Sequence, residues 1–434
     1  MTDTENNRLT SFQSNGTHLQ AHGPGVVVED GVYYLIGEDK TQGSAFQNIN
    51  CYSSRDLVQW EYEGALLSRG ASGDLGPNRV VERPKVIRNP RTGAYVLFLH
   101  IDSSNYGEAK VGIATGDSVC GRYNYRGSFR PLGRVSRDMG VFVDPDTSTG
   151  YLLSEDRDAG LRLLKLTDDF LDIDSDVYLW PQAIESPAIV KRNGRYYVFG
   201  SHLTGWDAND NVYSTSTRLD GGWSSWREFA RDGSNTYTSQ TSYVLPLGDE
   251  GEGALYLGDR WVPSNLAAST YVWLPLAIDG ETVTMADRVS WVPDMAEATW
   301  SEAPDETAYE GEAATYGGGA RDVSCSRCSG GRAAGYVGGP DGGTVTFSGI
   351  RSDTAGLTTV RVAFLNGDSA PRYANARVNG GAPQRLAFVQ ATGSPSSSTL
   401  HTELKAGSDN TIVIEGLGDG SYGPDVDRLI VPVS

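Results

Sequence analysis

One local pattern recurs five times in the first two-thirds of the chain: a turn containing glycine, an aromatic residue, and then alternating apolar residues. The copies are "VEDGVYYLIGED" around Tyr34, "NPRTGAYVLFLHID" around Tyr95, "PDTSTGYLLSED" around Tyr151, "KRNGRYYVFGSH" around Tyr196 and "DEGEGALYLGDRW" around Tyr256. Their spacings are 61, 56, 45 and 60 residues. Most copies are followed by another strand-like run, and no helical period is sustained between them. The pattern therefore predicts one small β-sheet per repeat.

Five such sheets arranged around an axis form a five-bladed β-propeller, which is the fold that the repeats predict. A β-sandwich with irregular spacing is the competing arrangement, but it does not explain five similar copies. The inner strands of a propeller converge on its axis. Residues at the starts of those strands can therefore meet, although they are far apart in sequence.

The repeat ends near residue 297, where an acidic segment rich in small residues follows. Beyond it lie short runs such as "GTVTFSGI", "LTTVRVAFLNG" and "NTIVIEGLG", which are typical of a β-sandwich. The sequence therefore predicts an all-β chain. We expect a propeller over residues 1–296, a linker over 297–307 and a β-sandwich module of jelly-roll type over 308–434.

Composition narrows the classes of partner. Lys and Arg number 36 against 55 Asp and Glu, a net charge of −19, which disfavours binding to nucleic acid or to anionic membranes. No apolar run reaches the roughly 18 residues that a membrane span needs. The first residues, "MTDTENNRLTSF", do not resemble a signal peptide. If the protein is secreted, as we expect, this sequence begins after the cleavage site.

The four cysteines give two different expectations. Cys51 and Cys120 are isolated in sequence, which favours buried, unreactive side chains. Cys325 and Cys328 form a single "CSRC" motif, which favours a local disulfide over a zinc site because no second pair accompanies it. In "DPDTSTGYLLSE", glycine falls at position seven instead of the six of a calcium loop, so we expect a hairpin turn there.

Polar residues stand at the start of one predicted inner strand in each repeat. They are His22 in "QAHGPGVVV", Glu82 in "VVERPKV", Asp138 in "SRDMGVFVD", Glu185 in "IESPAIV" and Gln240 in "TSQTSYVLPL". Any one alone is equally well explained as a paired, buried polar group. Several carboxylates that share a poorly solvated pocket have pKa values pushed apart, which provides a proton donor and groups that tune it. Glycoside hydrolysis needs that arrangement.

Together with "YYLIGEDK", "HIDSSNYGEAKVGIA" and "YLGDRW", these motifs resemble glycoside hydrolase family 43, most closely its exo-β-1,3-galactanase branch. The resemblance covers essentially the whole predicted propeller. The C-terminal part resembles a family 35 carbohydrate-binding module in "YEGEAA", "CSRCSGG", "RYANARVNGG" and "GPDVDRLIV".

The resemblance implies roles for the inner-strand residues. Glu185 corresponds to the general acid, Asp138 to the aspartate that tunes it and contacts the sugar, and Glu82 to a further acidic residue of the branch. Most members of the family carry an aspartate base on the first blade, where this chain has His22. Gln240 corresponds to the glutamine that holds the attacking water in the branch. An amide is a weak base, so this role requires an imidic acid tautomer or a water shared with Glu82.

The resemblance also implies that four further residues form the sugar subsite: Glu38, Tyr106, Thr204 and Trp206. Trp206 could equally be a packing residue, and the role of Trp261 is open. In the module, Glu310, Glu312 and Asp427 correspond to ligands of a structural calcium, although an exposed acidic edge would look similar. No cofactor is expected for catalysis.

The implied activity is that of an inverting, exo-acting galactan 1,3-β-galactosidase, a monomer acting on the β-1,3-galactan backbone of arabinogalactans. Two other readings remain. An α-L-arabinofuranosidase or β-xylosidase on the same propeller is disfavoured by the missing first-blade aspartate. A non-catalytic galactan-binding protein is disfavoured because binding alone would not need Glu82, Asp138 and Glu185 together.

Overall fold

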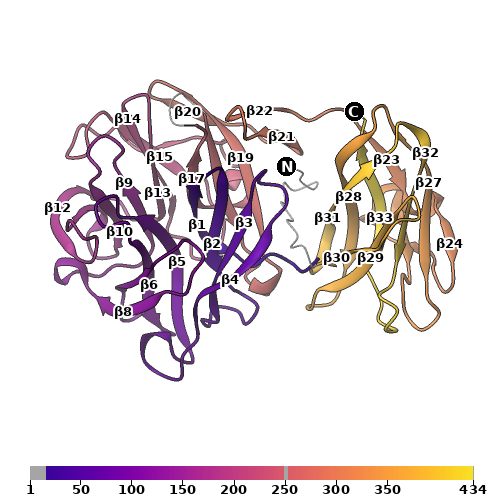
Figure 1. Cartoon of the computed structure of the whole chain (residues 1–434), viewed down its shortest axis with the longest axis horizontal. Helices are drawn as coiled ribbons and strands as arrows, with labels where there is room; N and C mark the ends of the chain where they lie inside the picture. The colour runs from indigo at the N-terminus through magenta and orange to yellow at the C-terminus, as the bar shows by residue number, and fades with distance from the viewer. Residues whose placement is uncertain (1–15, 249–252, 434) are drawn as a thin grey trace.

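The computed structural model describes residues 16–248 and 253–433, so the expectation about a signal peptide at residues 1–12 lies outside the described residues. The described chain consists of a propeller followed by a β-sandwich (Figure 1). Among these residues no helix has the length and apolar character needed to cross a bilayer. The predicted all-β fold is confirmed.

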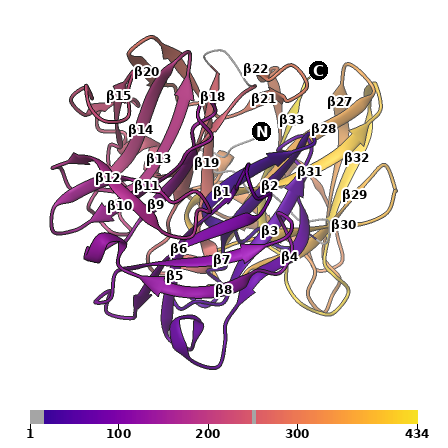
Figure 2. The same ribbon diagram turned by 60° about the vertical axis from the view of Figure 1, so that its left-hand side comes forward.

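Five four-stranded antiparallel sheets form the propeller, and Figure 2 shows them ranged around a common centre. The blades are β1–β4 (His22–Glu29, Val32–Glu38, Asn48–Ser54, Glu61–Ser68), β5–β8 (Arg79–Arg88, Tyr95–Ser103, Lys110–Gly116, Asn124–Phe129), β9–β12 (Met139–Val143, Gly150–Asp156, Gly160–Leu166, Ile173–Trp180), β13–β16 (Ile184–Arg192, Arg195–His202, Val212–Ser216, Arg227–Glu228) and β17–β20 (Gln240–Pro246, Ala254–Arg260, Thr270–Asp279, Thr282–Met285). Each repeated tyrosine lies in the second strand of its blade. The segment 144–149 is the hairpin turn between β9 and β10, as expected.

The first strands of the blades surround the axis, and each contacts the next, with β17 closing the ring against β1. Valine or isoleucine from every first strand lines a hollow of about 410 Å³ at one end of the axis: Val26, Val86, Val141, Ile189 and Val244. The polar candidate residues lie at the starts of the same strands, toward the other end. One end of the first strands therefore packs apolar side chains around the axis, and the other end carries the polar candidate residues.

In three blades the candidate residue is followed by a residue with positive φ and then by proline. The three sequences are His22-Gly23-Pro24, Glu82-Arg83-Pro84 and Glu185-Ser186-Pro187, with φ of +57°, +53° and +53° at the middle residue. The strand register shifts at each of these points. A β-bulge bends the strand and re-aims nearby side chains, and proline is tolerated there because no ladder hydrogen bond is lost. The bulges explain how side chains at the strand starts turn toward the axis.

Two disulfides are present among the described residues. Cys325 and Cys328 are bonded, which confirms the local disulfide. Cys51 and Cys120 are also bonded, so the expectation of two isolated thiols was wrong. Cys51 lies in β3 of the first blade and Cys120 follows β7 of the second. The fold brings them together across 69 residues, a proximity that their sequence positions do not reveal.

The C-terminal module is a sandwich of two antiparallel sheets. One has the order β25-β26-β33-β28-β31, with β23 also paired to β33, and the other has the order β24-β27-β32-β29-β30. The strands are β23 (Glu306–Glu310), β24 (Thr315–Gly317), β25 (Arg321–Ser324), β26 (Arg332–Gly335), β27 (Thr344–Ser352), β28 (Gly356–Asn366), β29 (Arg372–Val378), β30 (Gln384–Phe388), β31 (Ala391–Leu404), β32 (Gly407–Glu415) and β33 (Asp425–Pro432).

The chain passes from propeller to module through a two-stranded hairpin of β21 (Trp291–Asp294) and β22 (Thr299–Glu302) (Figure 1). The segment predicted as a linker, 297–307, therefore contains β22 and the first residues of β23. The propeller also touches the module directly: Asn265 donates hydrogen bonds from Nδ2 to Ser369 O at 2.8 Å and to Gln390 Oε1 at 2.9 Å.

Candidate active site

A cavity of about 250 Å³ brings together four of the five residues predicted from the strand starts. Its lining residues are Glu82, Arg83, His100, Tyr106, Arg137, Asp138, Arg157, Glu185, Leu203, Gly205, Trp206 and Gln240. Glu82, Asp138, Glu185 and Gln240 come from four different blades. His22, from the remaining blade, is not among the lining residues.

The cavity has a simple structural origin. The start of each first strand pairs with the end of the second strand of the same blade. The pairs are His22 with Glu38, Glu82 with His100, Glu185 with Ser201, and Gln240 with Asp259. Polar residues at the ends of the second strands therefore stand beside those at the starts of the first strands, and both sets contribute to the pocket.

Glu185 is 5 % exposed and is held mainly by neutral donors. Its Oε1 accepts hydrogen bonds from the backbone N–H of Thr204 at 3.3 Å and from Gln240 Nε2 at 3.1 Å. Its nearest cation is Arg157, with Nη2 3.6 Å from Oε2. Burial, with Asp138 and Glu155 nearby, raises the pKa of Glu185 to about 8. Glu185 therefore keeps its proton at neutral pH and can donate it, as a general acid must.

Asp138 contacts the bulges that follow Glu82 and Glu185. Its Oδ2 accepts hydrogen bonds from the backbone N–H of Ser186 at 3.0 Å and from Ser186 Oγ at 2.8 Å. The same oxygen lies 3.0 Å from Arg83 Nε. Arg83 and Ser186 are the non-glycine residues with positive φ that follow Glu82 and Glu185. A conformation of this kind persists only where the surroundings hold it, and Asp138 provides that support.

Glu82 lies in the opposite electrostatic environment from Glu185. Its Oε1 lies 3.2 Å from Lys40 Nζ and accepts a hydrogen bond from Tyr106 Oη at 3.1 Å. His100 Nδ1 lies 3.6 Å from Oε2. Burial alone would raise the pKa of Glu82, but Lys40, His100 and Arg83 outweigh it and hold that pKa well below its usual value. Glu82 is therefore ionised.

The side-chain amide of Gln240 is bonded on both sides. Its Oε1 accepts hydrogen bonds from Arg83 Nη2 at 2.6 Å and from Trp261 Nε1 at 2.8 Å. Its Nε2 donates to Glu185 Oε1 at 3.1 Å and to Gly205 O at 3.3 Å. Arginine and tryptophan can only donate, so their positions determine which end of the amide carries the oxygen.

His22 is fully buried behind the pocket. Its Nδ1 lies 3.0 Å from Asp259 Oδ1, and its ring stacks on Tyr271 with a centroid separation of 4.7 Å. Asp259 also accepts a hydrogen bond from Gly23 N at 2.9 Å. His22 thus supports the wall formed by Trp261, whose ring centroid is 5.2 Å away.

The four predicted subsite residues lie in or beside the pocket. Tyr106 and Trp206 line it. Glu38 is 3 % exposed and lies behind the lining residues. Its Oε1 accepts a hydrogen bond from the backbone N–H of Arg83 at 2.8 Å, and its Oε2 lies 2.5 Å from Lys40 Nζ. Thr204 is exposed at the rim and contacts Glu185 through its backbone. Trp206 is half-buried and meets Trp261 edge-to-face, with centroids 4.7 Å apart.

Sequence reasoning missed the cations of the site and one carboxylate. These residues are Lys40, Arg83, His100, Arg157 and Glu155. Contacts with Asp102 and Glu82 outweigh burial and raise the pKa of His100 to about 9, so it is also cationic. A signal was present for His100 and Glu155: the repeats end in "GED", "HID", "SED", "GSH" and "GDRW", which are the polar ends of the second strands.

Two groups of ligating side chains meet at Asp138, one with Glu82 and His100 and the other with Glu155 and Glu185. Arg83 lies against Asp138, Lys40 against Glu82, and Arg157 against Glu185. Because Asp138 and Glu82 already pair with cations and Glu185 holds its proton, the arrangement fits a network of ion pairs and hydrogen bonds better than a metal centre.

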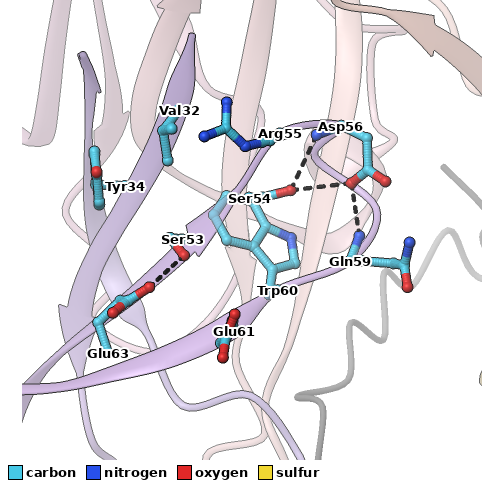
Figure 3. A pocket seen from close by; sticks show the side chains of 10 residues that line it. All are labelled: Val32, Tyr34, Ser53, Ser54, Arg55, Asp56, Gln59, Trp60, Glu61 and Glu63. Carbon is cyan, nitrogen blue, oxygen red and sulfur yellow. Dashed lines mark hydrogen bonds between the residues drawn. The ribbon is translucent and has the colours of Figure 1, made fainter. Parts of the chain in front are cut away.

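A second hollow, of about 520 Å³, lies on the first blade away from this cluster (Figure 3). Its polar side chains bond one another: Ser53 Oγ donates to Glu63 at 2.6 Å, and Asp56 accepts from Ser54 Oγ at 3.0 Å and from Gln59 N at 2.8 Å. The Ser53 contact joins β3 to β4 and the Asp56 contacts are those of a turn, so we assign no chemistry to this hollow.

In the module, the three predicted calcium ligands surround the turn at residues 329–331. Glu310 Oε1 accepts a hydrogen bond from Ser329 Oγ at 3.1 Å, and Asp427 Oδ1 accepts one from Ser329 N at 2.9 Å. A Cβ at Gly330 would lie 2.2 Å from Glu312 Oε1. Oε2 of both glutamates is buried and has no hydrogen-bond partner among the described residues. Unsatisfied carboxylate oxygens of this kind fit a hard cation.

Comparisons with known proteins identify the family to which the propeller is similar. Residues 17–244 match the family model described as glycosyl hydrolases family 43. A search of curated proteins found no match. Crystal structures of an exo-β-1,3-galactanase from Phanerochaete chrysosporium, with β-1,3-galactotriose and with galactose, are 36 % identical, cover 99 % of both chains and superpose with a TM-score of 0.70. An exo-β-1,3-galactanase from Clostridium thermocellum is 26 % identical over 93 % of this chain and 99 % of its own, with a TM-score of 0.66.

The comparison corrects the expectation for the module. Residues 344–431 match a family model described as an α-galactosidase CBM13 domain, so the module is CBM13-like and the family 35 assignment was wrong. Two of the four motifs used for that assignment, "YEGEAA" and "CSRCSGG", lie before the matched region. Short motifs on alternating strands do not separate one sandwich family from another.

Three observations indicate the same family: the propeller, the pocket at the starts of its inner strands and the match over residues 17–244. The chain belongs to glycoside hydrolase family 43, a family of inverting enzymes.

Proposed function

We propose that this enzyme is an exo-acting β-1,3-galactanase that releases galactose from the β-1,3-galactan backbone of arabinogalactans with inversion of configuration. The observation that carries the proposal is a single cavity that holds Glu185, hydrogen-bonded to Gln240 Nε2, together with Asp138 and with Glu82, which lies beside Lys40. The relatives with bound β-1,3-galactotriose and galactose support the choice of substrate.

In the proposed reaction Glu185 gives its proton to the glycosidic oxygen as the bond to the anomeric carbon breaks. A water forms the new bond to that carbon from the opposite face. Asp138 keeps the pKa of Glu185 high through its negative charge and holds Ser186, the next residue. Glu82 is ionised and can take the proton that the water releases.

The surroundings of Gln240 favour a water-positioning role over an imidic acid tautomer. That tautomer places a hydrogen on Oε1, but Arg83 and Trp261 both donate to this atom and cannot accept. The amide form satisfies all four contacts. The longer hydrogen bond to Gly205 O, at 3.3 Å, is the one that a water can replace. Gln240 would then orient the water while Glu82 receives its proton.

For the module we propose two roles. The unsatisfied oxygens of Glu310 and Glu312, with Asp427, would hold a structural calcium that joins the start of the module to its last strand. Tyr336 and Tyr422 are 41 % and 45 % exposed, with ring centroids 6.0 Å apart, and offer faces on which a galactose ring can stack. The two disulfides fit an extracellular enzyme.

The test is the release of galactose from linear β-1,3-galactan, with the anomer of the first product identified by NMR. We expect α-galactose from the non-reducing end. Hydrolysis of aryl α-L-arabinofuranoside or aryl β-xyloside in preference to galactan would identify one of the other activities. Binding of galactan without hydrolysis of any of these substrates would identify a non-catalytic protein.

A further inference from the structure

The loop between β18 and β19, residues 261–269, begins in the active site at Trp261 and contacts the C-terminal module through Asn265, in its middle, and Ala268. At the active-site end, Trp261 donates its indole N–H to Gln240 Oε1 at 2.8 Å. Its ring packs against Trp206 and His22, with centroids 4.7 Å and 5.2 Å away. Trp261 is therefore one of the two donors that orient the amide of Gln240.

The 261–269 loop is short and internally bonded. Val262 N donates to Ser269 Oγ at 3.0 Å, and Asn265 N donates to Val262 O at 2.8 Å. The 3-10 turn Leu266–Ala268 follows, with Leu266 and Ala268 7 % and 4 % exposed. Because Val262 follows Trp261 directly, these hydrogen bonds link Trp261 to the part of the loop that contains Asn265 and Ala268.

Asn265 and Ala268 attach this loop to the module. Asn265 uses Nδ2 to donate to Ser369 O and to Gln390 Oε1, at 2.8 Å and 2.9 Å. Ala268 belongs to the cluster of buried residues that forms the core of the module. The propeller thus contributes a residue to the hydrophobic core of its neighbour, which is a stronger attachment than a flexible tether would give.

Two residues of the segment before β1, Gln20 and His18, also contact the 261–269 loop. Gln20 Nε2 donates to Ala267 O at 3.0 Å, and its Oε1 accepts from Lys40 N at 3.0 Å. His18 Nε2 lies 2.9 Å from Ser269 O, and burial lowers the pKa of His18 to about 4, so the neutral ring donates this hydrogen bond. The segment before β1 is itself close to the module, since a Cβ at Gly16 would lie 2.1 Å from Arg385 O.

We propose that the C-terminal module is a structural part of the active site: by holding the 261–269 loop, it keeps Trp261 in place as a positioning residue for the amide of Gln240. This inference rests on the proposed function only for the role of Gln240. With Trp261 displaced, Oε1 keeps only the hydrogen bond from Arg83, and the amide is free to rotate away from the water it orients. The module then affects turnover on substrates too short to reach it.

Full-length variants test this coupling. Asn265→Ala removes both contacts with the module, Gln390→Ala removes one of them, and Trp261→Phe removes the indole donor while keeping an aromatic ring. On β-1,3-galactobiose we expect Asn265→Ala to lower kcat about three- to tenfold, the effect of losing one or two net hydrogen bonds, with little change in KM. Trp261→Phe should lower kcat further, and adding Asn265→Ala to it should have no additional effect.

Ser290→Ala is the matched control, because it removes a hydrogen bond to Glu306 of β23 that lies outside the 261–269 loop. This variant should keep the wild-type kcat. A second readout needs no substrate: the indole N–H signal of Trp261 in a spectrum of ¹⁵N-tryptophan protein, assigned among nine tryptophans through Trp261→Phe. We expect Asn265→Ala and Gln390→Ala to shift this signal.

Wild-type kcat and an unmoved indole signal in Asn265→Ala and Gln390→Ala would overturn the proposal. Equal losses in Ser290→Ala would overturn it too, because a general loosening of the two domains would then explain the effect. If the wild-type enzyme does not cleave galactobiose, the proposed function fails. The indole signal then decides the coupling alone: a shift supports it and an unmoved signal overturns it.

Discussion

Arg157→Met should move the alkaline limb of kcat/KM to higher pH. Arg157 Nη2 lies 3.6 Å from Glu185 Oε2, and its positive charge favours the ionised acid. The Arg157 side chain is 36 % exposed, so water screens the pair. Two unit charges about 4 Å apart interact by about 1 kcal/mol in water, which corresponds to about 0.7 of a pH unit. We therefore expect the limb, near pH 8 in the wild-type enzyme, to rise by about 0.5–1 pH unit.

A second effect opposes the first. Arg157 also pairs with Glu155, whose pKa burial and Asp138 raise. Without Arg157, Glu155 takes up a proton more readily and no longer repels the ionised form of Glu185. This change would lower the pKa of Glu185. We expect the direct contact to dominate, because Arg157 reaches Glu185 itself, whereas Glu155 acts only to the extent that its protonation changes.

The assay is the pH dependence of kcat/KM on β-1,3-galactobiose between pH 4 and 10, which reports the acid of the free enzyme. Arg157→Lys, which keeps the charge, is the control and should leave the alkaline limb near its wild-type position. An alkaline limb in Arg157→Met that stays in place or falls would refute the reasoning, since Arg157 would then not act on Glu185 by its charge.

Further predictions concern the acid, the water, the metal and the second disulfide. Glu185→Gln should lower turnover of galactan by several orders of magnitude and recover part of the rate on an aryl galactoside with a good leaving group. Because the folded state holds a proton on Glu185 between its ordinary pKa of 4.5 and about 8, stability falls as pH rises through that window. Glu185→Gln should therefore raise Tm more at pH 8.5 than at pH 5. Gln240→Ala should abolish hydrolysis while galactose still binds by calorimetry, and Gln240→Glu should also be impaired, because a further negative charge joins the site. His22→Ala should lower Tm because His22 is fully buried. Activity that survives Gln240→Ala but vanishes in His22→Ala would mean that His22, and not Gln240, acts on the attacking water. A chelator should lower the Tm of the module, and an unchanged melting curve would contradict the calcium site. Reduction should lower the Tm of the propeller by opening Cys51–Cys120, which closes a long segment of chain.

The sequence predicted the fold and the main residues of the pocket because both follow from a repeat. Tyr34 and its four counterparts mark the second strand of each blade, so counting them counts the blades. Glu82, Asp138, Glu185 and Gln240 stand at equivalent strand starts, and a propeller brings equivalent positions to one axis. Contacts without such equivalence could not be predicted. Cys51–Cys120 joins two blades at unrelated positions, and the attachment of Asn265 to the module depends on how two domains pack.

The resemblance assigned Glu185 as the acid, but strand position does not explain why Glu185 and Glu82 differ, because the protonation of each carboxylate depends on its partners. Glu82 and Glu185 occupy the same place in their blades, each followed by a bulge and a proline. Glu82 faces Lys40 and His100 and stays ionised. Glu185 faces an amide, a backbone N–H and one arginine, Arg157, which is 36 % exposed, and it stays protonated.

Apart from Gln240, which starts β17, these partners lie in the second strands or in the loops after them. Changing the partners of Glu82 or Glu185 should therefore change whether that carboxyl group holds a proton. A variant with Lys40→Met should raise the pKa of Glu82, because burial would then be opposed by one cation fewer. Its kcat/KM should acquire an acidic limb at higher pH than in the wild-type enzyme. An acidic limb that does not move would mean that Glu82 does not need to be ionised, and the proton of the attacking water would have to go elsewhere.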